Sequence, residues 1–166
     1  DRARTAGSIA RSISAGRHVD WEFVRPLVRD LRETDAVAAI ETVRGWLEDP
    51  RCDSIMAGVF DVSVLGNDGS RLLDDLAAWA RRRDEPSHVA FPTVLYYAVS
   101  SGRVELAREA LARMPAAWIG HLDNHWSVER APELSATALR PLVWSLASQE
   151  RLSDTEDAFL RMFSPP

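Results

Sequence analysis

Apolar side chains recur every three or four residues along most of this chain, which is the spacing of a helix with one buried face. At position 20 an aspartate precedes such a run, and a carboxylate there can accept hydrogen bonds from the first free amides of a helix. We therefore predict a helix that starts after Asp20. Its expected buried residues are Trp21, Val24, Leu27, Val28 and Leu31.

The same spacing predicts the remaining helices. Thr34 or Asp35 can cap the next one, and it ends at Asp49 because the residue before a proline disfavours helical geometry. Gly102 stands where a glycine C-cap is expected between two further helices. The buried stripe after Asp35 is Val37, Ile40, Val43 and Leu47, and the later helices are expected over 70–83, 89–101, 103–114, 135–146 and 154–163.

Residues 54–65 fit two descriptions. Ile55, Met56, Val59 and Phe60 have helical spacing, whereas the segment 60–64 alternates between apolar and polar residues as a strand would. We favour a helix because a single strand would have no partner, although 58–65 stay open. The predicted fold is all-α, with seven or eight helices in antiparallel hairpins that pack as a bundle or short irregular solenoid.

Two segments share a short sequence pattern. Arg25-Pro26-Leu27-Val28 is followed by Leu31, and Arg140-Pro141-Leu142-Val143 is followed by Leu146. A proline suits the first turn of a helix. The pattern indicates either a degenerate repeat of helical hairpins or the similar residue needs of any two amphipathic helices.

The stretch from His88 to Pro115 resembles one hairpin of the tetratricopeptide and pentatricopeptide superfamily. The resemblance is carried by the run from Tyr97 to Pro115, with a Gly-Arg turn and a small residue, Ala107 or Ala110, at the expected helix crossing. It implies a helix-turn-helix unit, and families of this type are scaffolds for peptides or RNA.

A second resemblance is to the kinase-binding helical bundles of AvrPtoB-type type III effectors of plant pathogens. It spans about 35 residues and is carried by Ser8-Ile9, Ser14-Ala15-Gly16, Leu31-Arg32 and Asp35-Ala36-Val37-Ala38. No binding residue is transferred on this resemblance. It implies a helical module that binds another protein.

Composition and charge support one globular domain. The chain has 166 residues, of which 46% are hydrophobic and 27% charged, a composition that favours a folded domain over a disordered segment. Residues 1–18 carry a charge of +3 and are expected to form a short basic helix, which leaves −8 on the domain predicted over 19–166. The first residue, Asp1, and the end at Pro166 suggest a piece of a longer protein.

One cluster has metal-ligand spacing. His121 and His125 are four positions apart, so on a helix they would share a face, with Asp123 as a further ligand. The alternative function is therefore a metal-dependent hydrolase using these three residues. Position 122 is leucine, so the glutamate of an H-E-x-x-H helix is absent. The single cysteine, Cys52, lies near a helix start that could lower its pKa, but no nucleophile signature surrounds it.

Tryptophan and arginine are the residue types most typical of binding hot spots, and the chain has six tryptophans. We expect no cofactor, no membrane segment and no nucleic-acid partner, because the acidic body opposes a polyanion. The expected partner is another protein. Its predicted contacts are Trp46, Trp118, Trp126, Arg81, Arg82 and Arg83.

The sequence thus predicts a non-enzymatic protein-interaction module, part of a bacterial effector or larger regulatory protein. All 20 basic residues are arginine and none is lysine. A coding bias would produce this, but it also removes every side-chain amine for ubiquitin attachment. The predicted location is cytoplasmic, with delivery into a host cell and binding of a host protein as the alternative.

Overall fold

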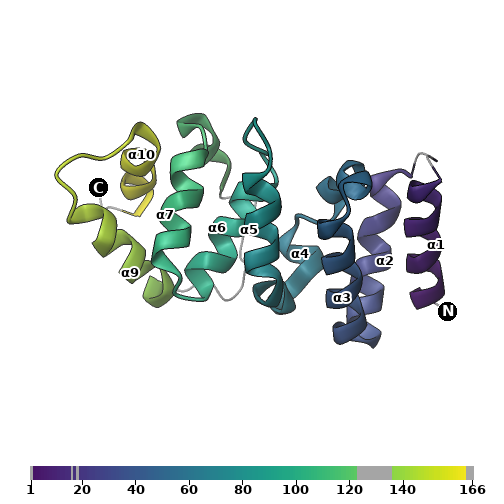
Figure 1. Cartoon of the computed structure of the whole chain (residues 1–166). Coiled ribbons are helices and arrows are strands. Elements are labelled where there is room, and N and C mark those ends of the chain that lie inside the picture. Colours follow the sequence, from purple (N-terminus) through teal and green to yellow (C-terminus); the bar gives the residue numbers. More distant parts are fainter. Residues whose placement is uncertain (1, 16, 18, 123–135, 164–166) are drawn as a thin grey trace. The chain divides into compact units, whose positions relative to one another are not determined.

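The protein is all-α. The computed structural model describes residues 2–15, 17, 19–122 and 136–163, and within them it contains nine α-helices, three 3₁₀-helices and no strand (Figure 1). This confirms the predicted fold class, with one helix more than the upper number expected.

The chain divides into two compact units, residues 1–82 and 83–166. The predicted boundary between residues 18 and 19 falls inside the first unit, because the basic N-terminal helix packs on the helices that follow it. The first unit consists of α1 (Arg2–Ser14), α2 (Trp21–Thr34), α3 (Ala36–Glu48), η1 (Pro50–Gly58), α4 (Val62–Leu65), η2 (Gly66–Leu72) and α5 (Leu73–Arg81).

Aspartates start four helical segments of the first unit. Asp20 accepts a hydrogen bond from the Glu22 amide at 3.0 Å, and Asp35 accepts one from the Ala38 amide at 3.0 Å. Asp49 and Asp61 cap η1 and α4 in the same way. Each carboxylate satisfies an amide that has no partner inside its helix, so the caps expected before α2 and α3 are confirmed.

The segment after α3 is helical but not one continuous helix. Within the segment 54–65, expected as a helix, residues 54–58 lie in the 3₁₀-helix η1 and residues 62–65 form the single turn of α4, with 59–61 between them. Their apolar residues are buried, which explains the helical spacing in the sequence. The 3₁₀-helix η2 follows α4, and its first residue, Gly66, has φ of +56°. A side chain there would be strained and would collide with the Arg32 guanidinium.

The second unit is built around a helix that is buried along nearly its whole length. Residues 90–99 of α6 (Ala90–Ser100) are all buried, and α7 and α9 both pack on this helix. The remaining elements are α7 (Val104–Arg113), η3 (Ala116–His121), α9 (Ala136–Ala147) and α10 (Asp154–Phe163).

Gly102 forms the turn between α6 and α7 as expected. It has φ of +67°, its amide donates to the Val99 carbonyl at 3.0 Å, and the Arg103 amide donates to the Ala98 carbonyl at 2.8 Å. These two bonds are those of a Schellman motif. The two helices are therefore joined by a tight turn and pack against each other.

Three sequence expectations differ from the structure. Trp21, expected among the buried residues of α2, is 38% exposed. Val37 was placed on the buried stripe of α3, but it is 57% exposed because the stripe begins at Ala39. Pro26 and Pro141 were expected in first turns, yet each lies inside its helix, α2 and α9 respectively.

Six arginines connect segments that are far apart in the sequence, and we call them the bridging arginines. Their guanidinium groups donate to residues 30 to 41 positions away. Arg32 reaches the Val64 carbonyl at 2.8 Å, and Arg44 reaches Asp75 at 3.0 Å. The carboxylates of Asp75 and Glu41 raise the pKa of Arg44. The others are Arg25 to Asp61, Arg82 to the Leu47 carbonyl, Arg108 to Gln149, and Arg113 to the Arg83 carbonyl.

We predict that residues 1–82 and residues 83–166 fold when they are expressed separately, because each unit has its own core. Far-ultraviolet circular dichroism should give a helical spectrum and a cooperative thermal transition for each. A division inside the first unit, into 1–66 and 67–166, is the control and should leave its shorter fragment unfolded. Loss of the cooperative transition in either half of the 82/83 pair would contradict the prediction.

Candidate protein-interaction surface

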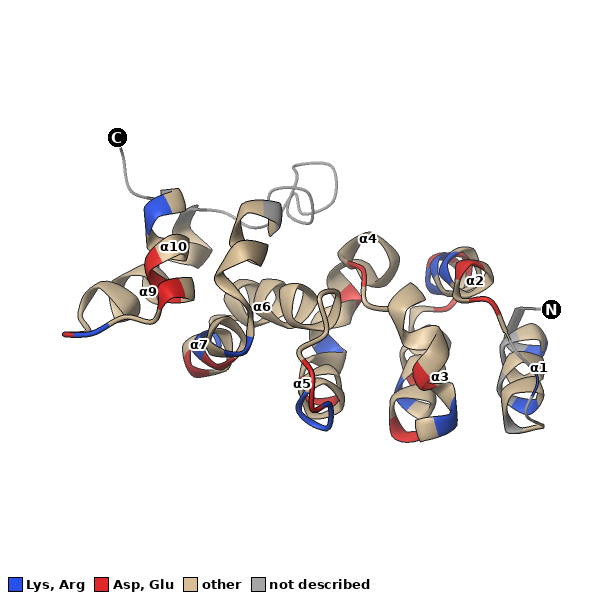
Figure 2. Cartoon of the chain, turned by 90° about the horizontal axis from the view of Figure 1, so that it is seen from above, with Lys and Arg blue, Asp and Glu red and all other residues tan. Residues whose placement is uncertain are grey.

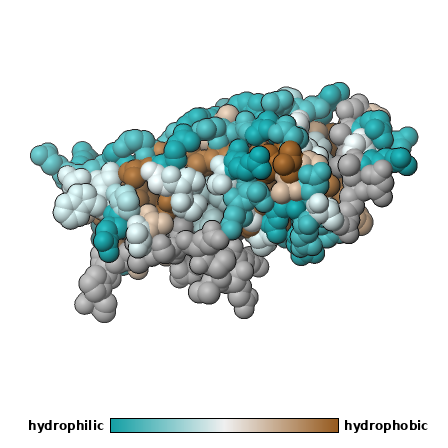
Figure 3. Space-filling view, turned by 90° about the horizontal axis from the view of Figure 1, so that it is seen from below, coloured by the Kyte–Doolittle hydropathy of each residue, from teal (hydrophilic) through white to brown (hydrophobic). Residues whose placement is uncertain are grey.

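Four large apolar side chains are exposed in the part of the chain that the structure describes. They are Trp21 at 38%, Phe23 at 72%, Val37 at 57% and Trp144 at 77%. The face seen in Figure 3 is mostly hydrophilic, with hydrophobic side chains in small patches. Exposed aromatic groups on an otherwise polar surface mark candidate contact sites.

Two of these side chains lie in the first turn of α2. We call Trp21, Phe23 and Arg25 the α2 aromatic surface. Trp21 and Arg25 are four residues apart and share a helix face, and the Arg25 guanidinium carbon lies 5.5 Å from the centre of the Trp21 ring. This is a cation–π distance, so the arginine restrains the indole in one orientation.

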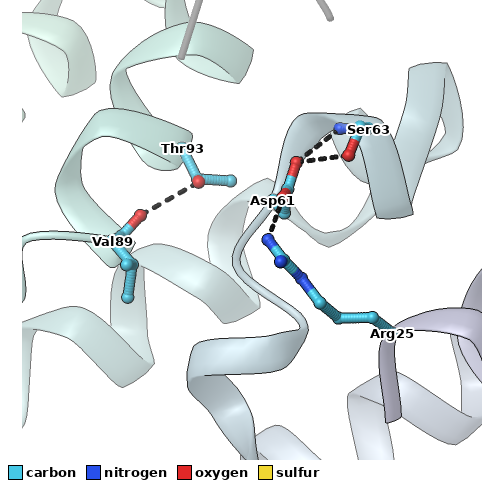
Figure 4. Close-up of polar contacts among 5 residues, drawn as sticks. All are labelled: Arg25, Asp61, Ser63, Val89 and Thr93. Atoms are coloured by element: carbon cyan, nitrogen blue, oxygen red, sulfur yellow. Dashed lines mark hydrogen bonds and ion pairs between the residues drawn. The ribbon is translucent and has the colours of Figure 1, made fainter. Parts of the chain in front are cut away.

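Arg25 is itself held by the first turn of α4. Its Nη2 donates to Asp61 Oδ2, while Asp61 Oδ1 accepts from the Ser63 amide at 2.8 Å and from the Ser63 hydroxyl at 2.7 Å (Figure 4). The side chain of Asp61 is 14% exposed and that of Arg25 42%. A chain of contacts thus runs from Ser63 through the carboxylate and the guanidinium to the indole.

The backbone beneath this surface is closely packed. A Cβ atom at Gly58, the last residue of η1, would collide with the Trp21 carbonyl. Only glycine allows η1 to approach the first turn of α2 so closely. The start of α2 is therefore supported by η1 as well as by its Asp20 cap.

Phe23 points away from the core and has a second apolar group beside it. Pro26, three residues later on the same helix face, is also exposed. The surrounding charges are mixed, because α1 contributes exposed arginines while Asp20 and Glu22 flank Trp21 (Figure 2). The α2 aromatic surface is thus an apolar site within a charged rim.

The predicted contact residues differ in their exposure to solvent. Trp46 is 3% exposed and belongs to the core of the first unit. Trp118 is half-buried, with His88 edge-on at 6.2 Å between ring centres. Trp126 lies outside the described residues.

The three consecutive arginines occupy the boundary of the two units. Arg81 and Arg82 are exposed, and Arg82 donates to the Leu47 carbonyl of the first unit at 2.5 Å. Arg83 is half-buried, and its carbonyl accepts from Arg113 of the second unit at 3.3 Å. Arg82 and Arg83 are therefore each bonded within their own unit, Arg82 through its guanidinium group and Arg83 through its backbone carbonyl.

Two of the proposed metal ligands, Asp123 and His125, lie outside the described residues, and His121 is the last residue of η3. Among the residues that the structure does describe, no three His, Cys, Asp or Glu side chains gather in a way that could hold a metal ion. The hydrolase alternative therefore stays a prediction.

The position of Cys52 does not suit a nucleophile. It is 1% exposed, and burial raises the pKa of its thiol, the opposite of the lowering that a helix start could give. The thiol is therefore protonated at neutral pH and enclosed by the core of the first unit.

An apolar hollow near Arg32 is too small for a ligand site. Its volume is about 10 Å³, far below the roughly 300–1,000 Å³ of ligand pockets. The hollow is lined by Val28, Arg32, Ala39, Ile40, Val43, Val64 and Leu65.

No helix in the described parts of the chain is long and apolar enough to cross a membrane.

The fold and this surface define an all-α protein with exposed aromatic contacts. Nothing matched the chain when it was compared with models of protein families, with curated proteins and with solved structures.

Phe23 and Trp144 were missed by the sequence prediction, although a signal for them exists. Both lie outside the buried stripe of their helix. The buried residues are Val24 and Val28 in α2 and Leu142 and Leu146 in α9. A large apolar residue outside the buried stripe of an amphipathic helix is expected to be exposed.

We predict that Asp61→Ala lowers the free energy of unfolding by about 1–3 kcal/mol, because it removes both a helix cap and the partner of Arg25. Urea unfolding of the purified protein measures this change. Glu41→Ala is the control: Glu41 is an exposed partner of Arg44, which keeps its bond to Asp75, so the change should stay within about 0.5 kcal/mol. Equal effects of the two substitutions would contradict the prediction.

Proposed function

We propose that this protein is a non-enzymatic protein-interaction module that binds another protein through the α2 aromatic surface. The observation that carries the proposal is a pair of exposed aromatic side chains, Trp21 and Phe23, in one helical turn that is fixed from two sides. The proposal agrees with the module predicted from sequence but moves its contact residues from Trp46 to α2.

The residue types favour a protein partner. Tryptophan and arginine are enriched at binding hot spots, and phenylalanine at interface cores. Burying one such ring removes about 150–250 Å² from water, and Phe23 keeps most of its surface available for this. Trp21 and Phe23 are two positions apart and point to different sides of α2, so a partner that covers both rings must extend around the first turn of the helix. Burial of both rings would then add the free energy of removing their exposed apolar area from water.

The fixed geometry adds to the affinity that the rings can supply. Ordering a mobile side chain on binding costs about 0.5–1.5 kcal/mol. Trp21 is already restrained by Arg25, Arg25 by Asp61, and the backbone by Gly58. Most of the ordering is therefore complete before a partner arrives, which is the arrangement that tight and specific recognition requires.

Capture of partners on the immobilised chain, followed by affinity measurement with a retained protein, tests the proposal. We expect Phe23→Ala to weaken binding by about 30-fold, which corresponds to the loss of a hot-spot side chain. Val37→Ala is the matched control, because Val37 is an exposed apolar residue of α3, and it should leave affinity within about twofold.

Two results would contradict the proposal. Either no protein binds the wild-type chain saturably, or every retained protein binds the Phe23→Ala variant as tightly as the wild type. Circular dichroism of both variants shows that the substitutions have left the fold intact.

A further inference from the structure

The second unit has an exposed surface of its own on α9. Along this helix the exposed residues are spaced like one face of a helix, and we call them the α9 ridge. Trp144 is its largest member and the most exposed large apolar residue among those described, at 77%. The other members of the ridge are Thr137, Arg140, Pro141 and Ala147, and the exposed Ser148 continues it just past the end of the helix.

The opposite face of α9 is anchored. Leu139, Leu142 and Leu146 are at most 8% exposed, and α9 packs on α6, α7 and α10. The helix is therefore a fixed element of the second unit, and Trp144 is held outward on a rigid support. Packing in the unit does not account for a tryptophan at this position.

The charge on α9 differs from that of its neighbours. Arg140 is its only charged residue, and the helix has no acidic residue. The helices α7 and α10 both carry acidic residues (Figure 2), and residues 83–166 together have 8 arginines against 11 acidic residues. The ridge is thus a neutral to positive strip on an acidic unit.

We propose that the α9 ridge docks into an apolar groove of a second partner protein whose rim carries carboxylates. A helix with anchors at i, i+4 and i+7 is one of the recurring ways in which proteins recognise a groove. Trp144 enters the groove, and Arg140, one turn earlier, forms a paired hydrogen bond with a rim carboxylate. Small residues at 141 and 147 let the partner approach the helix closely.

Charge selects this partner over other classes. A nucleic acid gains affinity from many basic contacts along its phosphates, whereas the α9 ridge offers a single arginine, which is enough to pair with one rim carboxylate. An acidic rim gains from Arg140 and is not repelled by the helix, because α9 bears no carboxylate. Complementary charge of this kind governs specificity and the rate of association.

The buried cysteine allows a site-directed probe. Because Cys52 is 1% exposed and its thiol has a raised pKa, a cysteine introduced by Ser148→Cys can be labelled selectively with a maleimide benzophenone. The labelled full-length protein is irradiated in a lysate of the cell that encodes it, and the cross-linked peptide of the partner is identified by mass spectrometry. The unlabelled wild-type chain is the competitor.

The expected result has three parts. A competed cross-link forms in an apolar segment flanked by Asp or Glu, Trp144→Ala weakens binding of that partner about tenfold or more, and Arg140→Gln weakens it by a smaller factor and reduces its salt dependence. Arg151→Gln, an exposed arginine outside the ridge, is the matched control and leaves affinity unchanged.

The proposal is overturned if no competed cross-link forms, if the cross-linked segment has no carboxylates, or if Arg140→Gln and Arg151→Gln act alike. Phe23→Ala in the labelled protein should leave the cross-link intact. Since that residue belongs to the α2 aromatic surface, the outcome of this test is independent of the function proposed above.

Discussion

The rest of the structure depends on hydrogen bonds that arginine side chains make between distant segments. Apolar packing buries one face of each helix but does not by itself fix how far one helix slides along another. A guanidinium group offers five donors in a rigid planar fork, so a bond such as Arg32 to the Val64 carbonyl fixes both distance and direction. In the first unit such bonds join α2 to α4, α3 to α5, and the end of α5 to α3.

This role changes how the absence of lysine is interpreted. A lysine ammonium is a flexible, strongly hydrated point charge, and it fixes the direction of a hydrogen bond less well than a rigid guanidinium group does. Six of the 20 arginines are bridging, so geometry accounts for arginine at those positions. Others, including Arg29 and Arg71, are exposed, and geometry sets no such requirement there. Coding bias, or selection against surface amines in a host cell, remains the explanation for those.

Local features of the fold were predictable from sequence and long-range ones were not. The all-α class, the caps Asp20 and Asp35, and the Gly102 turn depend on neighbouring residues, and the structure has them. The bridging arginines and the burial of Trp46 depend on which helices meet, which periodicity does not specify. Among the positions chosen for the candidate site, Trp46 is buried. Phe23 could have been found from its place outside the buried stripe of α2.

The most direct test of this account replaces arginine by lysine in two matched sets and measures the free energy of unfolding in urea. The first set is the six bridging arginines, and the second is six exposed ones: Arg11, Arg17, Arg29, Arg71, Arg140 and Arg151. Charge is conserved in both. At about 0.5–1.5 kcal/mol for each lost hydrogen bond, the first set should lose at least about 3 kcal/mol while the second stays within about 1 kcal/mol of the wild type. Equal losses from the two sets would contradict the account.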